Sequence, residues 1–353
     1  MHRPWFILCA LVLATAAQSL AASETVIGLL LPTGQEEAAS LRAGADLAIE
    51  QWNATNAIKA RLLVRGRESQ WGTEGQQAAE MVLDANVRGI IAPRDGAASH
   101  LALQIAGRTS TPVVSLCPDS SVIGAGIPWL LQIVPGTRDE ALALFTNNPA
   151  RHRWIAFTPD GRPGREIQND LRAAAAVARC DLAVMETAQP LRDQSPIAAR
   201  ALAMKPDGIL VWLDDTAAAG QLTAALRAAG FGGVLAAPSA IDSIRFSSVA
   251  GDAANSVQFA QRLRDTAAFR RFAGHFRDRF LSEAVPTTAW AFDATVLLLE
   301  VLQNAGERPA RAMFPLSNEH AGATGLLKFD HSGHRAFAFA PREEHVRFLP
   351  ESK

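Results

Sequence analysis

The sequence lacks tyrosine entirely, has only three cysteines, and carries almost no net charge. Among its 353 residues, 34 lysines and arginines face 35 aspartates and glutamates. A protein that binds nucleic acid needs a basic face for the phosphates, so this balance argues against a nucleic-acid partner. Beyond the N-terminal segment only Cys117 and Cys180 remain. They either form a disulfide in an oxidising compartment or, as is commoner for two lone cysteines, stay unpaired or buried.

Motifs of catalytic and cofactor sites are also missing. There is no Gly-x-Ser-x-Gly nucleophile turn and no His-Glu-x-x-His zinc helix. The glycine-rich stretch from Asp160 to Gly164 matches neither a phosphate-binding loop nor a dinucleotide fingerprint, so we interpret it as an ordinary loop. Since no nucleophile, base and orienting residue can be assembled, we expect a protein that is not an enzyme and that carries no cofactor.

The N-terminus has the pattern of a secretory signal peptide. A short positive end precedes an apolar run over residues 5–17, and small residues follow. A membrane-spanning helix needs about 20 apolar residues, and neither this run nor any later stretch provides them. We therefore expect cleavage after Ala21 or Ala22 and a soluble, monomeric protein in the periplasm.

The rest of the chain alternates short apolar runs with longer segments of helical period, which is typical of parallel sheets covered by helices. This pattern predicts an α/β fold. One helix would place Leu41, Ala45, Ala48 and Trp52 on a single buried face, and a second helix begins such a stripe at Trp290. The expected strands are residues 26–31, 61–64, 89–92, 113–116, 154–157, 182–185, 208–213 and 233–236. The gap between the fourth and fifth strands indicates two lobes, and the end of the chain is expected to form helices and then a hairpin.

Several segments resemble the leucine/isoleucine/valine-binding family of type I periplasmic solute-binding proteins, which serve ABC importers. They lie in the same order and spacing over nearly the whole mature length. The segments are residues 27–34 (IGLLLPTG), 42–49 (RAGADLAI), 89–93 (GIIAP), 111–115 (TPVVS), 205–210 (KPDGIL), 226–231 (LRAAGF), 289–294 (AWAFDA) and 322–330 (GATGLLKFD).

The resemblance implies two Rossmann-like lobes with parallel sheets, joined by a three-segment hinge. Lobe I would comprise residues 23–134 plus 257–318, and lobe II residues 135–256 plus 319–353, after a signal peptide over residues 1–22. A small-molecule solute would bind between the lobes and close them by hinge motion. The partner would be an ABC permease in the inner membrane.

The expected ligand-binding residues depart from those of amino-acid-binding relatives. In those relatives a loop serine and a small residue followed by threonine hold the carboxylate of the ligand, while an acidic residue and aromatics hold its ammonium. Here Gly96 stands where the serine is expected, Pro118 and Asp119 replace the small residue and threonine, Pro163 replaces a tyrosine, and Ser239 stands near the acidic position. The resemblance therefore implies a ligand other than an ordinary branched-chain amino acid.

The loops that follow the strands offer carboxylates instead. In α/β sheets ligands bind outside the carboxyl ends of the strands, so these loops supply the candidate ligand-binding residues: Trp71, Arg94, Asp95, Gly96, Cys117, Pro118, Asp119, Asp160, Pro163, Asp214 and Ser239. One hypothesis is that these aspartates, together with Asp215, form an acidic site for a cationic ligand. The competing and favoured interpretation is that each aspartate caps the helix after it. Trp71 and Trp212 would line the site or pack in the core.

Two further patterns have ordinary interpretations. His331 and His334 resemble a pair of metal ligands in their spacing. They fall where the family has a turn between terminal strands, so we expect a turn. The arginine-rich segment from Arg262 to Arg279 is expected to be a solvated helix face, with a docking face for a partner as the alternative.

Two functions remain open from the sequence. The leading one is the solute-binding component of an ABC importer. The other is a periplasmic ligand sensor or accessory factor on the same fold, which docks to an enzyme or receptor without transport.

Overall fold

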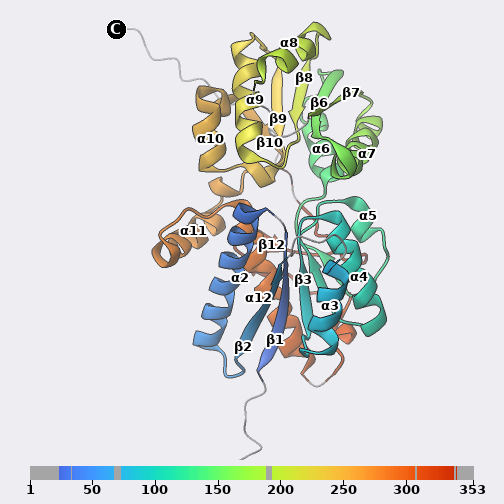
Figure 1. Ribbon diagram of the computed structural model, residues 1–353, viewed down its shortest axis with the longest axis vertical. Coiled ribbons are helices and arrows are strands. Elements are labelled where there is room, and N and C mark those ends of the chain that lie inside the picture. Colours follow the sequence, from blue (N-terminus) through green and yellow to red (C-terminus); the bar gives the residue numbers. More distant parts are fainter. Residues whose placement is uncertain are drawn as a thin grey trace, which may run out of the picture.

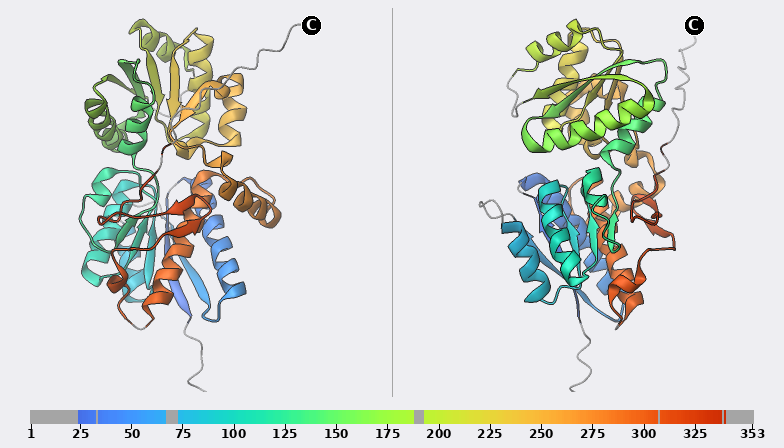
Figure 2. Two further views of the ribbon diagram at one scale, coloured as in Figure 1. Left: turned by 180° about the vertical axis from the view of Figure 1, so that it is seen from behind. Right: turned by 90° about the vertical axis from the view of Figure 1, so that its right-hand side faces the viewer.

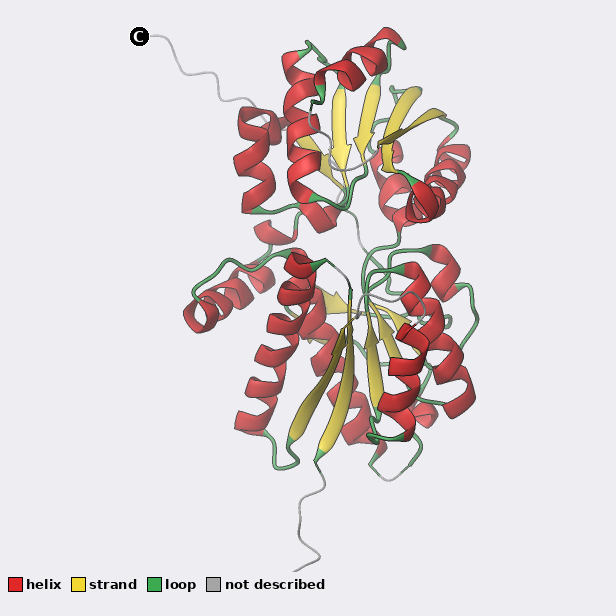
Figure 3. Ribbon diagram, viewed as in Figure 1, coloured by secondary structure: helices red, strands yellow, loops and turns green. Residues whose placement is uncertain are grey.

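The computed structural model describes residues 24–32, 34–66, 73–187, 193–306, 308–337 and 339. The expected signal peptide and its cleavage site lie outside this part. Figure 1 shows two lobes stacked along the long axis, and Figure 3 shows strands inside each lobe with helices around them. The expected fold class is therefore confirmed. Within the described ranges, no helix combines the length and the apolarity that crossing a bilayer requires.

Lobe I is built on a parallel sheet with the strand order β2-β1-β3-β4-β5. Its first elements are β1 (Thr25–Leu31), α2 (Gln35–Thr55), β2 (Ala60–Gly66), α3 (Thr73–Leu83), β3 (Gly89–Ala92), α4 (Gly96–Thr109), β4 (Val113–Ser115), α5 (Ser120–Ile123) and β5 (Leu130–Gln132). Alternate residues of β1 enter separate cores. Ile27 and Leu29 face α2, whereas Val26 and Leu30 face α3 and α4.

Lobe II repeats this plan with the order β10-β9-β8-β6-β7. Its elements are α6 (Thr137–Thr146), β6 (Arg153–Pro159), α7 (Gly161–Ala178), β7 (Asp181–Thr187), α8 (Ser195–Ala203), β8 (Gly208–Val211), α9 (Thr216–Ala228), β9 (Val234–Ala237), η1 (Ser239–Ile241), α10 (Ile244–Ala250), η2 (Gly251–Ser256) and β10 (Val257–Phe259). Ile155 and Phe157 face the core under α8 to α10, and Trp154 and Ala156 face the core under α6 and α7.

The chain then returns to lobe I, as the two views in Figure 2 show. The returning elements are η3 (Leu263–Asp265), α11 (Ala267–Phe280), α12 (Pro286–Ala305), η4 (Ala310–Met313), β11 (His320–Gly322) and β12 (Gly325–Leu327). The expected apolar stripes of α2 and α12 are both buried. The two helices pack so closely that a Cβ on Gly44 would lie 2.1 Å from the Thr288 carbonyl oxygen.

Three segments connect the lobes. The first joins β5 to α6, the second joins β10 to η3, and the third runs from Arg335, which is buried in lobe I, to Phe339, which packs against the α6 and α7 core of lobe II. Leu263 of η3 already belongs to the lobe I core. The expected three-segment hinge is present.

The expected lobe boundaries differ from the structure at two places. Residues 257–259 form β10 and pair with β9, so they belong to lobe II rather than lobe I. The hairpin of β11 and β12 belongs to lobe I rather than lobe II, because Ala323, Leu327 and Phe329 are buried in its core. The first shift comes from the pairing of a three-residue strand with β9, and the second comes from burial of the hairpin side chains in the lobe I core; neither is recorded in a local sequence pattern.

The two described cysteines lie in different lobes and are unpaired. Cys117 is fully buried under the lobe I sheet, whereas Cys180 is partly exposed in lobe II. Of the two alternatives left open by the sequence, the structure has the unpaired one.

Candidate functional site

The carboxyl ends of the strands of both lobes point toward one another, and the residues that follow β1, β3 and β4 meet those that follow β6, β8 and β9. We call this region the interlobe face. Three of its aspartates are helix caps. Asp95 accepts a hydrogen bond from the Ala98 amide, Asp119 accepts one from the Ser121 amide, and Asp215 accepts one from Ala218. The capping interpretation is confirmed for these three residues.

Asp214, directly before the Asp215 cap, has no such role. Part of the residue is exposed, but the protein around it removes enough water to raise the pKa of its carboxyl. Asp95 of lobe I raises that pKa further, and Arg94 of lobe I opposes the rise. Asp214 of lobe II therefore lies within electrostatic reach of the loop after β3.

Glu37 joins this group and was missed by the sequence analysis. It lies in the first turn of α2, and its buried Oε1 forms an ion pair with the Arg94 guanidinium at 3.3 Å. The pKa of its carboxyl is raised overall, mainly because the group is buried. The charge of Arg94 opposes the rise, and the charges of Asp214 and Asp95 add to it. Its position in the turn after β1 was the available signal, because that loop also opens onto the interlobe face.

Arg94 is the cation of this group of charged residues. It contacts Glu37 and lies over the ring of Trp290, 5.7 Å from the ring centroid. Trp290 is buried, and its indole N–H has no acceptor within the described chain. We call Glu37, Arg94, Asp95 and Asp214 the charged cluster. Its three carboxylates outnumber its one guanidinium, so it attracts positive charge.

A second meeting of carboxylates lies at Gly96. A Cβ at this position would be 3.0 Å from Glu166 of α7 in lobe II and 3.1 Å from Asp119 of lobe I. The absence of a side chain at Gly96 is what lets the two acids approach from opposite lobes. Arg162 pairs with Glu166 at 2.8 Å, while the second oxygen of Asp119 is buried and unpaired in the described structure.

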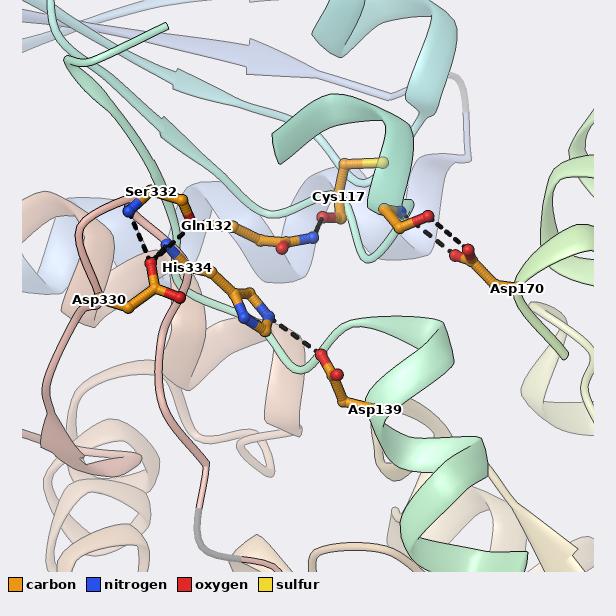
Figure 4. Close-up of polar contacts among 8 residues, drawn as sticks. Cys117, Gln132, Asp139, Asp170, Asp330, Ser332 and His334 are labelled. Atoms are coloured by element: carbon orange, nitrogen blue, oxygen red, sulfur yellow. Dashed lines mark hydrogen bonds and ion pairs between the residues drawn. The ribbon is translucent and has the colours of Figure 1, made fainter. Parts of the chain in front are cut away.

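Among the contacts that join the lobes in the described part of the chain, two lie between α5 and α7 and between α2 and α10. The amide and hydroxyl of Ser120, at the start of α5, both donate to Asp170 of α7, the amide at 3.2 Å. Arg245 of α10 pairs with Glu36 of α2. Burial raises the pKa of Asp170, and the two hydrogen bonds from Ser120 lower it. Figure 4 shows Asp170 reaching across to lobe I.

Three other expected ligand residues have structural roles. Cys117 is fully buried, burial raises the pKa of its thiol, and its carbonyl accepts a hydrogen bond from Gln132 at 2.7 Å. The carbonyl of Pro118 accepts from the Thr137 amide in the first crossing. Ser239 is 1% exposed. These hydrogen bonds lie where the chain crosses between the lobes.

Ser239 is hydrogen-bonded to Glu140, a buried carboxylate that the sequence analysis also missed. The Ser239 amide donates to Glu140 at 3.0 Å, and the Ser239 hydroxyl accepts from the Gln261 amide of the second crossing. Glu140 is 4% exposed. Burial raises the pKa of Glu140 to about 7, although the hydrogen bonds from Ser239 and the charge of Arg94 act against the rise.

The remaining expected residues are not brought to the charged cluster. Asp160 and Pro163 are exposed at the start of α7, and no contact found among the described residues joins either to lobe I. Trp71 lies outside the described residues. Trp212 packs in the core of lobe II. The arginine-rich segment forms η3 and α11, in which Arg264 pairs with Asp242 and Arg279 with Glu50.

The two terminal histidines lie in a turn, as expected. Asp330 Oδ1 accepts hydrogen bonds from the Ser332 and His334 amides, which closes the turn. The His334 ring points toward Asp139 of α6, as Figure 4 shows.

Comparisons with known proteins agree on one family and one fold. A family model described as "Periplasmic binding protein" matches residues 26–336. The fold is similar to that of LivK, a leucine-binding protein from Thermotoga maritima, with 18% identity and a TM-score of 0.73 over 88% of this chain and 93% of that one. Comparison with curated sequences gives no match.

Two solute-binding proteins of ABC transporters from Rhodopseudomonas palustris are also similar in fold. One was solved with 3,4-dihydroxybenzoic acid and shares 16% identity, a TM-score of 0.74, and coverage of 88% of this chain and 90% of that one. The other was solved with benzoate and shares 14% identity, a TM-score of 0.75, and coverage of 89% and 91%.

Proposed function

Because this chain belongs to the periplasmic binding protein family, we propose that it is the solute-binding component of an ABC importer, secreted to the periplasm as a monomer. It would bind a small solute at the interlobe face and deliver it to a permease in the inner membrane. The family match, the two lobes and the three-segment hinge support this proposal. Relatives of the same fold are named as solute-binding proteins of ABC transporters.

We further propose that the solute carries positive charge. The observation that carries this step is the charged cluster, in which Asp214 of lobe II acts electrostatically on Glu37 of lobe I and Arg94 pairs with Glu37. At an effective dielectric constant of 20, two carboxylates about 4 Å apart repel by about 4 kcal/mol. A cation between the lobes removes that repulsion.

The same cluster disfavours the solutes of the similar structures. A leucine or benzoate carboxylate would face Glu37, Asp95 and Asp214 with Arg94 alone to balance it, and Arg94 is already engaged by Glu37 and Trp290. An uncompensated buried charge costs several kcal/mol, which is enough to abolish micromolar affinity.

A thermal-shift screen of the mature protein tests both steps. We expect diamines, polyamines, basic amino acids or quaternary amines to raise the melting temperature, and leucine, isoleucine, valine and benzoate to leave it unchanged. A solute at 100 times its dissociation constant stabilises the folded state by about 2.7 kcal/mol. With the best cation, Glu37→Gln and Asp214→Asn should each weaken binding about ten- to a hundredfold, which corresponds to one charge-assisted hydrogen bond.

Asp160→Asn is the matched control, because Asp160 follows a strand of lobe II as Asp214 does but lies outside the charged cluster. Micromolar binding of leucine or benzoate would overturn the cationic class and leave the solute-binding role in place. Cation binding that neither Glu37→Gln nor Asp214→Asn weakens would place the site elsewhere.

A further inference from the structure

The turn that ends β12 presents an imidazole to the opposite lobe. The His334 Nε2 lies 3.0 Å from a carboxylate oxygen of Asp139, in the first turn of α6, directly after the first crossing. A Cβ at Gly136 would lie 2.7 Å from that Asp139 oxygen, so a side chain there would displace the carboxylate from the position in which it meets His334. The pair joins the third crossing to the first.

The backbone of His334 is fixed to lobe I. Its amide donates to Asp330 Oδ1, the Gln132 amide donates to the Gly333 carbonyl, and the Arg335 amide donates to the Gln132 carbonyl. Figure 4 shows the ring of His334 extending from this hydrogen-bonded backbone toward Asp139. Because Asp139 belongs to lobe II and His334 to lobe I, a hinge rotation that shifts the start of α6 relative to the turn changes their separation.

We propose that His334 and Asp139 form a proton-dependent latch that favours the close arrangement of the lobes when the imidazole is charged. Only the imidazolium forms an ion pair with the carboxylate, so loss of its proton weakens the latch. The charged groups that face the ring are Asp139 from α6 and Asp330 from its own turn. Both are acidic, and together they favour the charged imidazole.

The direction of the pH effect follows from this geometry. The hydrogen bond to Asp139 and the two negative charges raise the pKa of His334 above 6.5, although partial burial lowers it. A raised pKa means that the close arrangement binds the proton more tightly than an arrangement in which the pair is broken. The stabilisation is complete below the ordinary histidine pKa and is lost as the pH rises through the raised one.

The contact between Ser120 and Asp170 also joins the lobes, and it does not involve a histidine. It gives the lobes a contact that persists while the latch releases. The side chains of His334 and Asp139 are 24% and 39% exposed. For such a pair we expect the ratio of close to open molecules to change about two- to fivefold.

Single-molecule fluorescence energy transfer on the solute-free protein measures this ratio. Dyes on cysteines introduced at Ile58 and Met204, which are exposed in opposite lobes, report the separation, with Cys180 replaced by serine and the buried Cys117 retained. We expect the ratio to fall two- to fivefold as the pH rises from 6 to 8.5. His334→Gln and Asp139→Asn should each make it independent of pH, while His331→Gln, in the same turn, should behave like the parent protein.

An unchanged ratio in the parent protein, or a pH dependence that survives His334→Gln, would overturn the latch. A dependence abolished only by Glu140→Gln would assign the proton to that carboxyl and would overturn it too. Asp139→Asn keeps the test decisive if His334→Gln fails to fold. Since no solute is present, failure of the latch leaves the proposed function untouched, and failure of the solute screen leaves the latch untouched.

Discussion

Replacement of Glu140 by glutamine should remove a large pH dependence of stability. Glutamine keeps the carbonyl oxygen that accepts the Ser239 amide hydrogen, and it has the same shape, so the packing at the hinge is preserved. Glutamine lacks the negative charge of the ionised carboxylate, which burial disfavours. The variant therefore isolates the free energy of ionising this one buried carboxyl.

The magnitude follows from the two pKa values of Glu140, which are about 7 in the folded protein and 4.5 when the chain is unfolded. Between these values the folded state binds the proton more tightly, so the free energy of unfolding falls as the pH rises. Each pH unit between the two pKa values changes the free energy of unfolding by about 1.4 kcal/mol, so a pKa difference of about 2.5 gives a loss of at most about 3 kcal/mol. This stability is lost between pH 4.5 and 7, and the contribution of Glu140 does not change further above pH 7.

Urea unfolding of the parent and of Glu140→Gln at pH 5, 6, 7 and 8 measures this effect. We expect the difference in free energy between the two proteins to shift by up to about 3 kcal/mol in favour of the variant as the pH rises. Glu283→Gln, at an exposed glutamate, should show no such shift. If the difference between Glu140→Gln and the parent is the same at all four values, Glu140 does not titrate in this range and our account of its burial is wrong.

Two further substitutions test packing and capping. Gly44→Ala should lower the free energy of unfolding by about 1 to 3 kcal/mol, because its Cβ would lie 2.1 Å from a backbone oxygen of α12. Gly274→Ala, in α11 with open space around it, should instead raise stability by about 0.5 to 1 kcal/mol, and a loss there as large as that of Gly44→Ala would contradict the steric explanation. Asp95→Ala should cost about 1 kcal/mol through loss of the α4 cap, while Asp95→Asn, which still accepts the Ala98 amide hydrogen, should remain within a few tenths of the parent in the same urea assay.

The local pattern of the sequence predicted most of the scaffold. All eight expected strands are present, because buried parallel strands are continuous apolar runs bounded by turn residues. The stripes on α2 and α12 were readable because a helical period of 3.6 leaves one face apolar over several turns. β5 and β10 were missed because each has only three residues and one of them is a glutamine, whereas the equally short β4 lies in a run that continues to Leu116.

The roles of the aspartates were left as alternatives for a physical reason. A residue that precedes a helix after a strand is suited both to capping that helix and to meeting a ligand at the carboxyl end of the sheet. Asp95 and Asp119 cap their helices, whereas Asp214 does not and lies within reach of Arg94. Only the side-chain geometry distinguishes the two outcomes.

By itself the sequence determined the α/β class, the two lobes, the family resemblance and the loops that form the interlobe face, because each depends on patterns between near neighbours or on motif order. The tertiary structure alone decided that Glu37 joins Arg94 and Asp214, that Glu140 is buried against Ser239, and that His334 meets Asp139. These partners lie from 57 to 195 positions apart along the chain. Their charge, burial and pKa depend on which elements the packing of two lobes brings together, and no local pattern records that choice.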